Sequence, residues 1–183
     1  FQETFGAQVQ TRSRRAAPLT FSAGSVEYRL PAPFRLELAP CGAEVLGSEP
    51  DGNPAFTRFD YGQGEIYLLT APIERALADW PGAFHAPGAQ PFWRIYRRVA
   101  GRQLARRVVS KSHPMLGLTE HPLDQDPTGE TRVIVAINYS PAVLEDALSF
   151  APGWQVRETW RGSVPGGRLA LPPNDAAVFV VGK

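Results

Sequence analysis

Residues 131–138, TRVIVAIN, decide the fold class, because they form the strongest predicted strand of the sequence. Val133, Ile134, Val135 and Ile137 make this strand apolar on both faces, which is typical of a strand at the centre of a sheet. Short strands with turns between them follow at close spacing. They are predicted over residues 147–150, 154–160, 168–171 and 176–181.

The turns between these strands are rich in proline and glycine, as at Pro152-Gly153 and Pro165-Gly166-Gly167. A short strand over residues 115–119 and an acidic loop over residues 120–130 precede the central strand. Short strands with regularly spaced turns are typical of an antiparallel sandwich. The sequence therefore predicts a small antiparallel β-sandwich over residues 113–183, with a domain boundary near residue 112.

A hairpin is the clearest feature upstream of that boundary. Its strands cover residues 54–60 and 65–70, and the glycine-rich connection between them favours antiparallel pairing. A short helix is predicted over residues 73–79, and Pro72 suits its first turn. Further half-buried strands are predicted closer to the N-terminus. They cover residues 5–11, 26–30, 34–38 and 43–46, with a basic loop over residues 12–17 after the first.

Pro91 opens the only long helix that the sequence predicts. Phe92, Ile95, Tyr96 and Val99 lie at helical spacing and form one apolar stripe. Gly101 weakens the helix near its end. We expect the basic face of this helix to be a solvated or interface face, because no nucleic-acid-binding motif accompanies it. The basic residues are Arg94, Arg97, Arg98, Arg102, Arg106 and Arg107.

The composition of the 183 residues is that of an ordinary globular protein, with 43% hydrophobic and 20% charged residues. A net charge of +1 gives no field to recruit nucleic acid or an anionic membrane, so neither is an expected partner. The single cysteine, Cys41, excludes an intrachain disulfide but fits both the cytosol and an oxidising compartment. Because residues 1–4 lack the features of an intact signal peptide, the localisation stays open.

Cys41 is the natural suspect for a nucleophile. A glycine and a predicted strand follow it, however, where a nucleophilic cysteine needs a strained strand-to-helix turn and a nearby base. His113, His121 and Asp124 carry metal-ligating groups, but their spacing is wider than that of usual ligand pairs. We therefore expect an inert thiol and no metal site.

Paired carboxylates are the chemical requirement for hydrolysis of a glycosidic bond. The short helix carries Glu74 and Asp79, and the acidic loop carries a second set. Neither set has apolar neighbours arranged to raise the pKa of one carboxyl above the other. We therefore predict no catalytic residue and no cofactor among them. The loop set is Glu120, Asp124, Asp126 and Glu130.

Trp154 and Trp160 lie six residues apart, so on a regular strand they share one face. If that face is exposed, the two indoles can stack on sugar rings. If it is buried, they belong to the core. Both interpretations stay open at this point.

Two stretches together resemble a known arrangement in glycoside hydrolases. Residues 52–56 (GNPAF), 61–67 (YGQGEIY) and 72–74 (PIE) resemble a hairpin and helix near the end of an amidotransferase-like α/β domain. That domain follows the catalytic barrel in some of these enzymes, including β-galactosidases with a trimerisation domain. The tail resembles the small β-sandwich that closes such enzymes. It comprises residues 133–140, 160–162 and 171–180, and Phe5-Gly6 resembles a stretch inside the same α/β domain.

The resemblance implies an α+β, β-rich chain. Residues 1–112 would be the later part of an amidotransferase-like α/β domain with one long helix, and residues 113–183 an antiparallel β-sandwich. The barrel and its two catalytic glutamates would lie upstream, so no catalytic residue is carried over. The chain starts at Phe1 without an initiator methionine, which agrees with a fragment.

Three function classes follow for this chain. The first is a non-catalytic C-terminal portion of a carbohydrate-active enzyme with a structural or oligomerisation role. Its partners would be the missing N-terminal catalytic portion and further copies of itself. The second is a carbohydrate-binding module that uses Trp154 and Trp160. The third is an independent small enzyme that uses Cys41 or a carboxylate.

Overall fold

The computed structural model describes residues 1–83, 86–123 and 126–183, which form two compact units. The first unit is Phe1–Ala100 and the second is Gly101–Lys183. Each unit has its own hydrophobic core. The division between them falls within the helical segment, whereas the sequence analysis places a domain boundary near residue 112.

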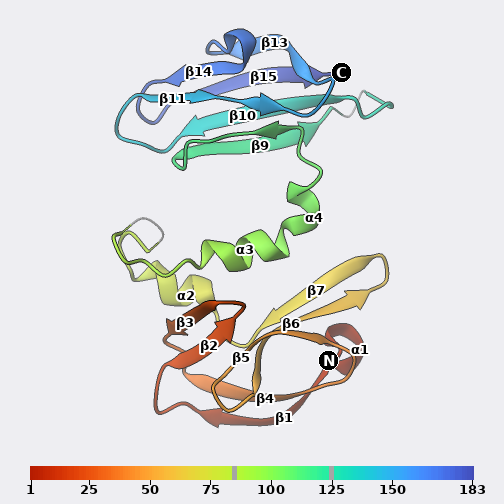
Figure 1. Cartoon of the computed structure of the whole chain (residues 1–183), viewed down its shortest axis with the longest axis vertical. Coiled ribbons are helices and arrows are strands. Elements are labelled where there is room, and N and C mark those ends of the chain that lie inside the picture. Colours follow the sequence, from red (N-terminus) through yellow and green to blue (C-terminus); the bar gives the residue numbers. More distant parts are fainter. Residues whose placement is uncertain (84–85, 124–125) are drawn as a thin grey trace. The chain divides into compact units, whose positions relative to one another are not determined.

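Strands dominate the first unit. Five of them form one antiparallel sheet in the order β3-β2-β5-β6-β7, and β1 pairs antiparallel with β4 in a separate ribbon (Figure 1). The elements are α1 (Gln2–Phe5), β1 (Ala7–Arg14), β2 (Leu19–Ala23), β3 (Val26–Leu30), β4 (Phe34–Pro40), β5 (Glu44–Ser48), β6 (Pro54–Tyr61), β7 (Gly64–Leu69), α2 (Ile73–Ala78) and α3 (Trp93–Val99).

Aromatic rings from the sheet and from Phe92, the residue just before α3, form the centre of the first core. Phe21 on β2 stacks on Tyr28 of β3 with the ring centroids 5.1 Å apart, and Phe92 lies 5.4 Å from Tyr28. The helices bury Ile73, Leu77 and Ile95 against the same cluster. The two helices are thus held on the sheet by the apolar residues of their inner faces.

The hairpin prediction is confirmed, because β6 and β7 pair from Phe56↔Leu69 to Tyr61↔Gly64. The N-terminal predictions are partly wrong. A short helix occupies Gln2–Phe5, and Gly6 ends it with a φ of 59°, so the first strand begins only at Ala7. That strand continues to Arg14, into residues expected to form a loop, because β4 offers it a partner over its whole length.

The predicted long helix is wrong in its length. It ends at Val99, and α4 (Gly101–Leu104) follows as a separate short helix. Ala100 separates the two helices, and Gly101, which was expected to weaken the helix, begins α4. The predicted stripe is buried only at Phe92 and Ile95, whereas Tyr96 and Val99 are exposed.

The second unit contains a four-stranded antiparallel sheet in the order β13-β15-β10-β9, with two short ribbons, β11-β14 and β12-β8. Its core cluster draws residues from all three. After α4 its elements are β8 (Val109–Ser110), β9 (Leu116–Pro122), β10 (Thr131–Asn138), β11 (Leu144–Ala147), β12 (Ser149–Phe150), β13 (Gln155–Arg161), a 3-10 turn (Pro165–Gly167), β14 (Arg168–Leu171) and β15 (Ala176–Gly182).

The central position of the strand at residues 131–138 is confirmed, because β10 pairs with β15 on one side and β9 on the other (Figure 1). The acidic loop starts later than expected, because β9 continues to Pro122 and includes Glu120. The molecule is thus β-rich with antiparallel pairing. Within the described ranges, no helix has the length and apolar character needed to cross a membrane.

Candidate functional site: a buried polar network and an adjoining groove

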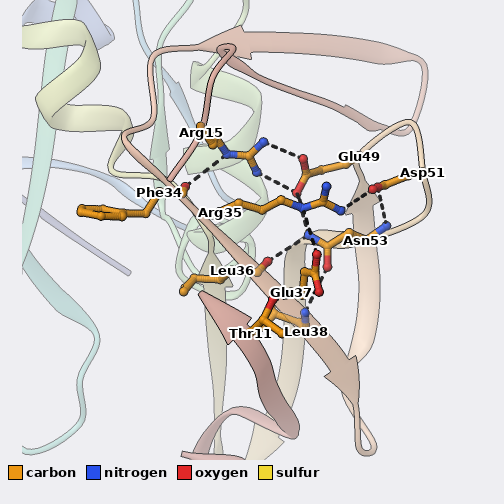
Figure 2. A network of polar contacts seen from close by, with 10 residues as sticks. All are labelled: Thr11, Arg15, Phe34, Arg35, Leu36, Glu37, Leu38, Glu49, Asp51 and Asn53. Atoms are coloured by element: carbon orange, nitrogen blue, oxygen red, sulfur yellow. Dashed lines mark hydrogen bonds and ion pairs between the residues drawn. The ribbon is translucent and has the colours of Figure 1, made fainter. Parts of the chain in front are cut away.

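A buried ion pair links the end of the β1-β4 ribbon to the five-stranded sheet. Arg15, just after β1, donates two parallel hydrogen bonds to the Glu49 carboxylate after β5, with N···O distances of 2.8 and 2.7 Å (Figure 2). The third arm of the guanidinium, Nε, donates to the Phe34 carbonyl at 3.1 Å. Both side chains are almost fully shielded from solvent. The bidentate geometry fixes the direction as well as the distance of the pair.

Asn53 connects this ion pair to β4. Its Nδ2 donates to Glu49 Oε1 at 2.6 Å and to the Leu36 carbonyl at 2.9 Å, and its Oδ1 accepts from the Leu38 N–H at 3.0 Å. One side chain therefore satisfies backbone groups of β4 from the turn between β5 and β6 (Figure 2). Asn53 belongs to the Gly52-Asn53-Pro54 motif, so this motif has a structural role in connecting the β5-β6 turn to β4.

Arg35 adds a second cation to the network. It forms an ion pair with Asp51, and its Nε lies 3.7 Å from Glu49 Oε1. That Nε is buried and has no hydrogen-bond partner among the described residues. The hydrogen bond from Arg35, together with the Asn53 N–H, lowers the pKa of Asp51. The Asp51 carboxylate in turn raises the pKa of Arg35.

Burial by itself would raise the pKa of Glu49, whose residue surface is only 7% exposed. Hydrogen bonds from Arg15 and Asn53 and the charges of Arg15 and Arg35 outweigh burial, so the pKa of Glu49 is lowered. An ionised carboxylate whose oxygens are already occupied by donors does not exchange protons near neutral pH. The network therefore positions backbone segments of β4 and the β5-β6 turn.

A groove of about 440 Å³ adjoins the ion pair. The groove is lined by small or rigid residues, including Ala32, Ala76, Pro31 and Pro33. Arg15 also lines it. The last turn of α2 and the residues after it contribute the larger groups of the wall. These are Arg75, Asp79 and Trp80.

The structure separates the two carboxylates predicted together on the short helix. Asp79 lines the groove beside Arg15, whereas Glu74 lines another groove with Tyr67. The Tyr96 hydroxyl donates to Glu74 at 2.9 Å. Burial and this carboxylate raise the pKa of Tyr96 to about 12.

The acidic set after β9 is divided among separate contacts. Glu120 accepts hydrogen bonds from the N–H groups of Val108 and Val109 at 3.1 to 3.2 Å. Asp126 accepts from Thr128, and hydrogen bonds from Thr128 and Thr131 lower its pKa to about 2. Glu130 lies 3.3 Å from the Lys183 ammonium. Asp124 lies outside the described residues.

The two histidines considered as metal ligands in the sequence each contact a neighbouring residue. His113 Nδ1 accepts the Met115 N–H at 3.1 Å, and His121 Nε2 lies 3.0 Å from the Thr119 hydroxyl. In the described ranges no group of three or more His, Cys, Asp and Glu side chains is placed to hold a metal ion.

Cys41 is exposed, and its Sγ lies 3.6 Å from the Ala39 carbonyl. Its N–H donates to the Gly6 carbonyl at 2.7 Å. The strand β5 starts at Glu44, so a strand and not a helix follows the cysteine, as the sequence predicts. This backbone lacks the strand-to-helix turn that presents a nucleophile.

The two tryptophans proposed as a sugar platform lie in different surroundings. Trp154 precedes β13, packs partly against the second core, and has the Arg132 guanidinium 5.6 Å from its ring. Trp160 on β13 is 54% exposed. Two register shifts, between Val156 and Glu158 and between Thr159 and Arg161, interrupt the alternation on which a shared face depends.

The basic face on α3 is exposed, as expected for a solvated or interface face. Arg94, Arg97 and Arg98 all lie at the surface, and Arg94 lies 5.5 Å from the Trp93 ring. One donor of the Arg107 guanidinium is used within the chain, because it donates to the Leu118 carbonyl at 2.7 Å.

No protein-family model matches the sequence, and no curated protein matches it either. Solved structures do match. The β-galactosidase of Rahnella sp. R3 aligns with 98% of this chain at 16% identity and a TM-score of 0.60, over 24% of its own length. The chain shares its fold with part of a glycoside hydrolase. It spans about a quarter of that protein's length.

Two other matches are more distant. The β-galactosidase of the psychrophilic Marinomonas ef1 aligns with 94% of this chain and 20% of its own, at 17% identity and a TM-score of 0.46. The exo-β-1,4-mannosidase of Opitutaceae bacterium strain TAV5 aligns with 54% of this chain and 17% of its own, at 22% identity and a TM-score of 0.42.

Sequence reasoning missed two asparagines that organise the loops. Asn53 is described above. Asn138, at the end of β10, is fully buried, and its Nδ2 donates to the carbonyls of Ala142, Leu171 and Pro172 at 2.8, 3.1 and 2.8 Å. The signal was present, because both lie in the stretches that resemble glycoside hydrolases. In sequence, however, Asn138 presents only a glycosylation sequon, and burial makes its amide inaccessible to that modification.

Proposed function

We propose that this chain is the non-catalytic C-terminal portion of a larger glycoside hydrolase. One observation carries the proposal: nearly the whole chain, both units included, has the fold of about a quarter of a β-galactosidase. Residues 1–112 would then be the later part of an amidotransferase-like α/β domain, and residues 113–183 the terminal β-sandwich. The Gly52-Asn53-Pro54 turn and the β6-β7 hairpin support the first assignment, and the antiparallel strands around β10 support the second.

The contacts of the carboxylates support a non-catalytic role. Hydrolysis of a glycoside needs two carboxyl groups on either side of the scissile bond, about 5 to 10 Å apart. Glu49 is held by Arg15 and Asn53, Glu120 by two backbone N–H groups, and Glu74 and Asp79 line different grooves. In this proposal the catalytic pair belongs to the rest of the enzyme.

The surface of the first unit supports a structural role within that enzyme. Among the described residues β1 has no strand partner besides β4, so its other edge offers the backbone groups of an eight-residue strand for further pairing. Val9 on β1 and Phe34 on β4 are exposed. A long open edge with apolar residues invites pairing by another chain segment. We assign this edge to the catalytic portion of the same enzyme.

The test is an assay of the isolated chain with a panel of aryl β-glycosides and α-glycosides. We expect no hydrolysis above an enzyme-free blank. Turnover that is absent from a matched preparation of an unrelated protein would contradict the non-catalytic role. Light scattering across a range of concentrations tests the oligomerisation role, for which we expect self-association; a monomer at every concentration would remove it.

A second candidate function is carbohydrate binding through Trp154 and Trp160. The exposure of Trp160 favours it, because an uncovered indole can stack on a sugar ring. Iodide quenching before and after addition of an oligosaccharide tests it. Protection of Trp160 fluorescence, lost in Trp160→Ala, is expected under this alternative, and unchanged quenching would remove it.

A further inference from the structure

Trp80 has an environment unlike that of a core tryptophan. It follows α2, is 41% exposed, and is absent from both core clusters. Within the described ranges its ring has no stacking partner and no cation over it, unlike Trp93 and Trp154, which each have an arginine nearby. Trp80 also lines the groove of about 440 Å³ beside Arg15. The indole therefore presents free apolar surface at a hollow.

Polar groups accompany this ring. Arg75 on α2 and Asp79, the residue that caps the C-terminal end of α2, line the same groove. Neither side chain forms a hydrogen bond or an ion pair with another described residue. A guanidinium with free donors and a carboxylate with free acceptors thus border the ring, and both are available to a ligand.

The charges of the groove cancel. Glu49 neutralises Arg15 through two hydrogen bonds, and Asp79 offsets Arg75. A groove without net charge has no preference for a phosphate or for a cation. Its volume lies within the range of small-molecule sites. Four prolines, at positions 18, 31, 33 and 72, contribute to the walls, and their fixed φ angles keep the shape constant before a ligand arrives.

We propose that this groove binds a neutral saccharide, with the sugar ring stacked on Trp80 and its hydroxyl groups bonded to Asp79 and Arg75. A pyranose has an apolar face of C–H groups and a rim of hydroxyls. This combination matches an indole flanked by a carboxylate and a guanidinium. The inference rests on the proposed function as a part of a carbohydrate-active enzyme. It names a site separate from Trp154 and Trp160.

The experiment follows the indole N–H signals of the 15N-labelled chain by NMR. The chain has four tryptophans, and each signal is assigned by its loss in a single-residue variant. Lactose and cellobiose are the neutral probes, titrated to tens of millimolar. Galacturonate and glucosamine are the charged controls. We expect a saturable shift of the Trp80 signal with the neutral sugars. The affinity of Trp80→Ala, which lacks this signal, is measured by calorimetry beside the wild-type chain and should be about tenfold weaker.

Trp93→Ala is the matched control, because Trp93 is an exposed tryptophan of the same unit that does not line this groove. It should leave the affinity unchanged. Asp79→Asn tests the polar contact without changing the shape, and we expect a severalfold loss of affinity. Circular dichroism checks that each variant is folded. Trp80→Phe keeps a stacking surface and should retain part of the binding.

Three results would overturn the inference: no Trp80 shift with any neutral sugar, equal binding by the wild-type chain and Trp80→Ala, or tighter binding of the charged sugars. The first of these results, if accompanied by a shift of the Trp160 signal, would favour the second candidate function. None of these results depends on hydrolysis, so the proposed non-catalytic role is judged separately, by the glycoside assay.

Discussion

In both units an asparagine side chain connects backbone segments that are distant in sequence, but the groups it bonds to differ. Each unit fastens distant backbone segments with one asparagine side chain, Asn53 in the first unit and Asn138 in the second. The Asn138 side chain bonds to backbone groups, namely three carbonyls and the Ser140 N–H. Asn53 shares Glu49 with Arg15, so its network includes a buried ion pair. The stability of the first unit therefore depends on the ionisation state of Glu49, whereas Asn138 of the second unit does not titrate.

The largest effect is expected from Glu49→Ala in the first unit. The change leaves the Arg15 guanidinium buried without its carboxylate, and breaking a buried pair in this way typically costs about 3–5 kcal/mol. Urea unfolding followed by circular dichroism measures it. Glu130→Ala is the matched control, because its ion pair with Lys183 is exposed and should contribute little. Equal effects of the two substitutions would contradict the importance of burial.

A smaller effect is expected from Asn138→Ala in the second unit. The substitution removes the donor to three carbonyls, and an unsatisfied buried polar group costs about 1–3 kcal/mol. Hydrogen exchange of the β10 and β15 amides would report the loss in the unit concerned. An unchanged exchange rate would show that water replaces the amide and that this asparagine is dispensable.

Acid should separate the two networks. The pKa of Glu49 is lowered in the folded state, so the unfolded chain binds the proton more readily and stability rises with pH. The contribution of Glu49 is complete above the unfolded pKa of about 4.3 and is lost as pH falls through the lower folded value. Glu49→Gln should flatten this part of the pH profile, whereas Asn138→Ala should only lower it. If Glu49→Gln leaves the pH profile of stability unchanged, Glu49 is not the group responsible for this part of the profile.

The smallest effect on stability is expected from Trp80→Ala, because the ring lies outside both core clusters. Surface substitutions of this kind usually change the free energy of unfolding by no more than about 0.5 kcal/mol. Trp154→Ala is the comparison, since Trp154 packs against the second core and should destabilise more. Thermal melts of the two variants measure the difference, and a larger loss for Trp80→Ala would place that ring in the core.

Sequence patterns predicted correctly the elements whose formation depends on neighbouring residues. The hairpin of β6 and β7 and the strand at residues 131–138 follow from alternation and turn residues, and both are present. Sequence patterns failed where pairing with a strand distant in sequence determines the extent of an element. β1 extends to Arg14 because β4 pairs with it, and β2 at Leu19–Ala23 was not foreseen.

The site was harder to predict than the fold. Arg15 and Glu49 are 34 residues apart, and nothing in either neighbourhood indicates that they meet. The spacing of Trp154 and Trp160 indicated a shared face, but two register shifts in β13 interrupt the regular strand it assumed. No sequence pattern marks Trp80, because its groove is formed by alanines and prolines from three separate segments that come together only in the folded chain.

The size of the native polypeptide that contains this chain shows whether the chain is part of a larger glycoside hydrolase. An antibody raised against the 20.0 kDa chain would be used on an extract of the source organism after denaturing electrophoresis. Because the chain matches 24% of a β-galactosidase, we predict a band about four times its size. A single band at the size of the chain itself would contradict the claim.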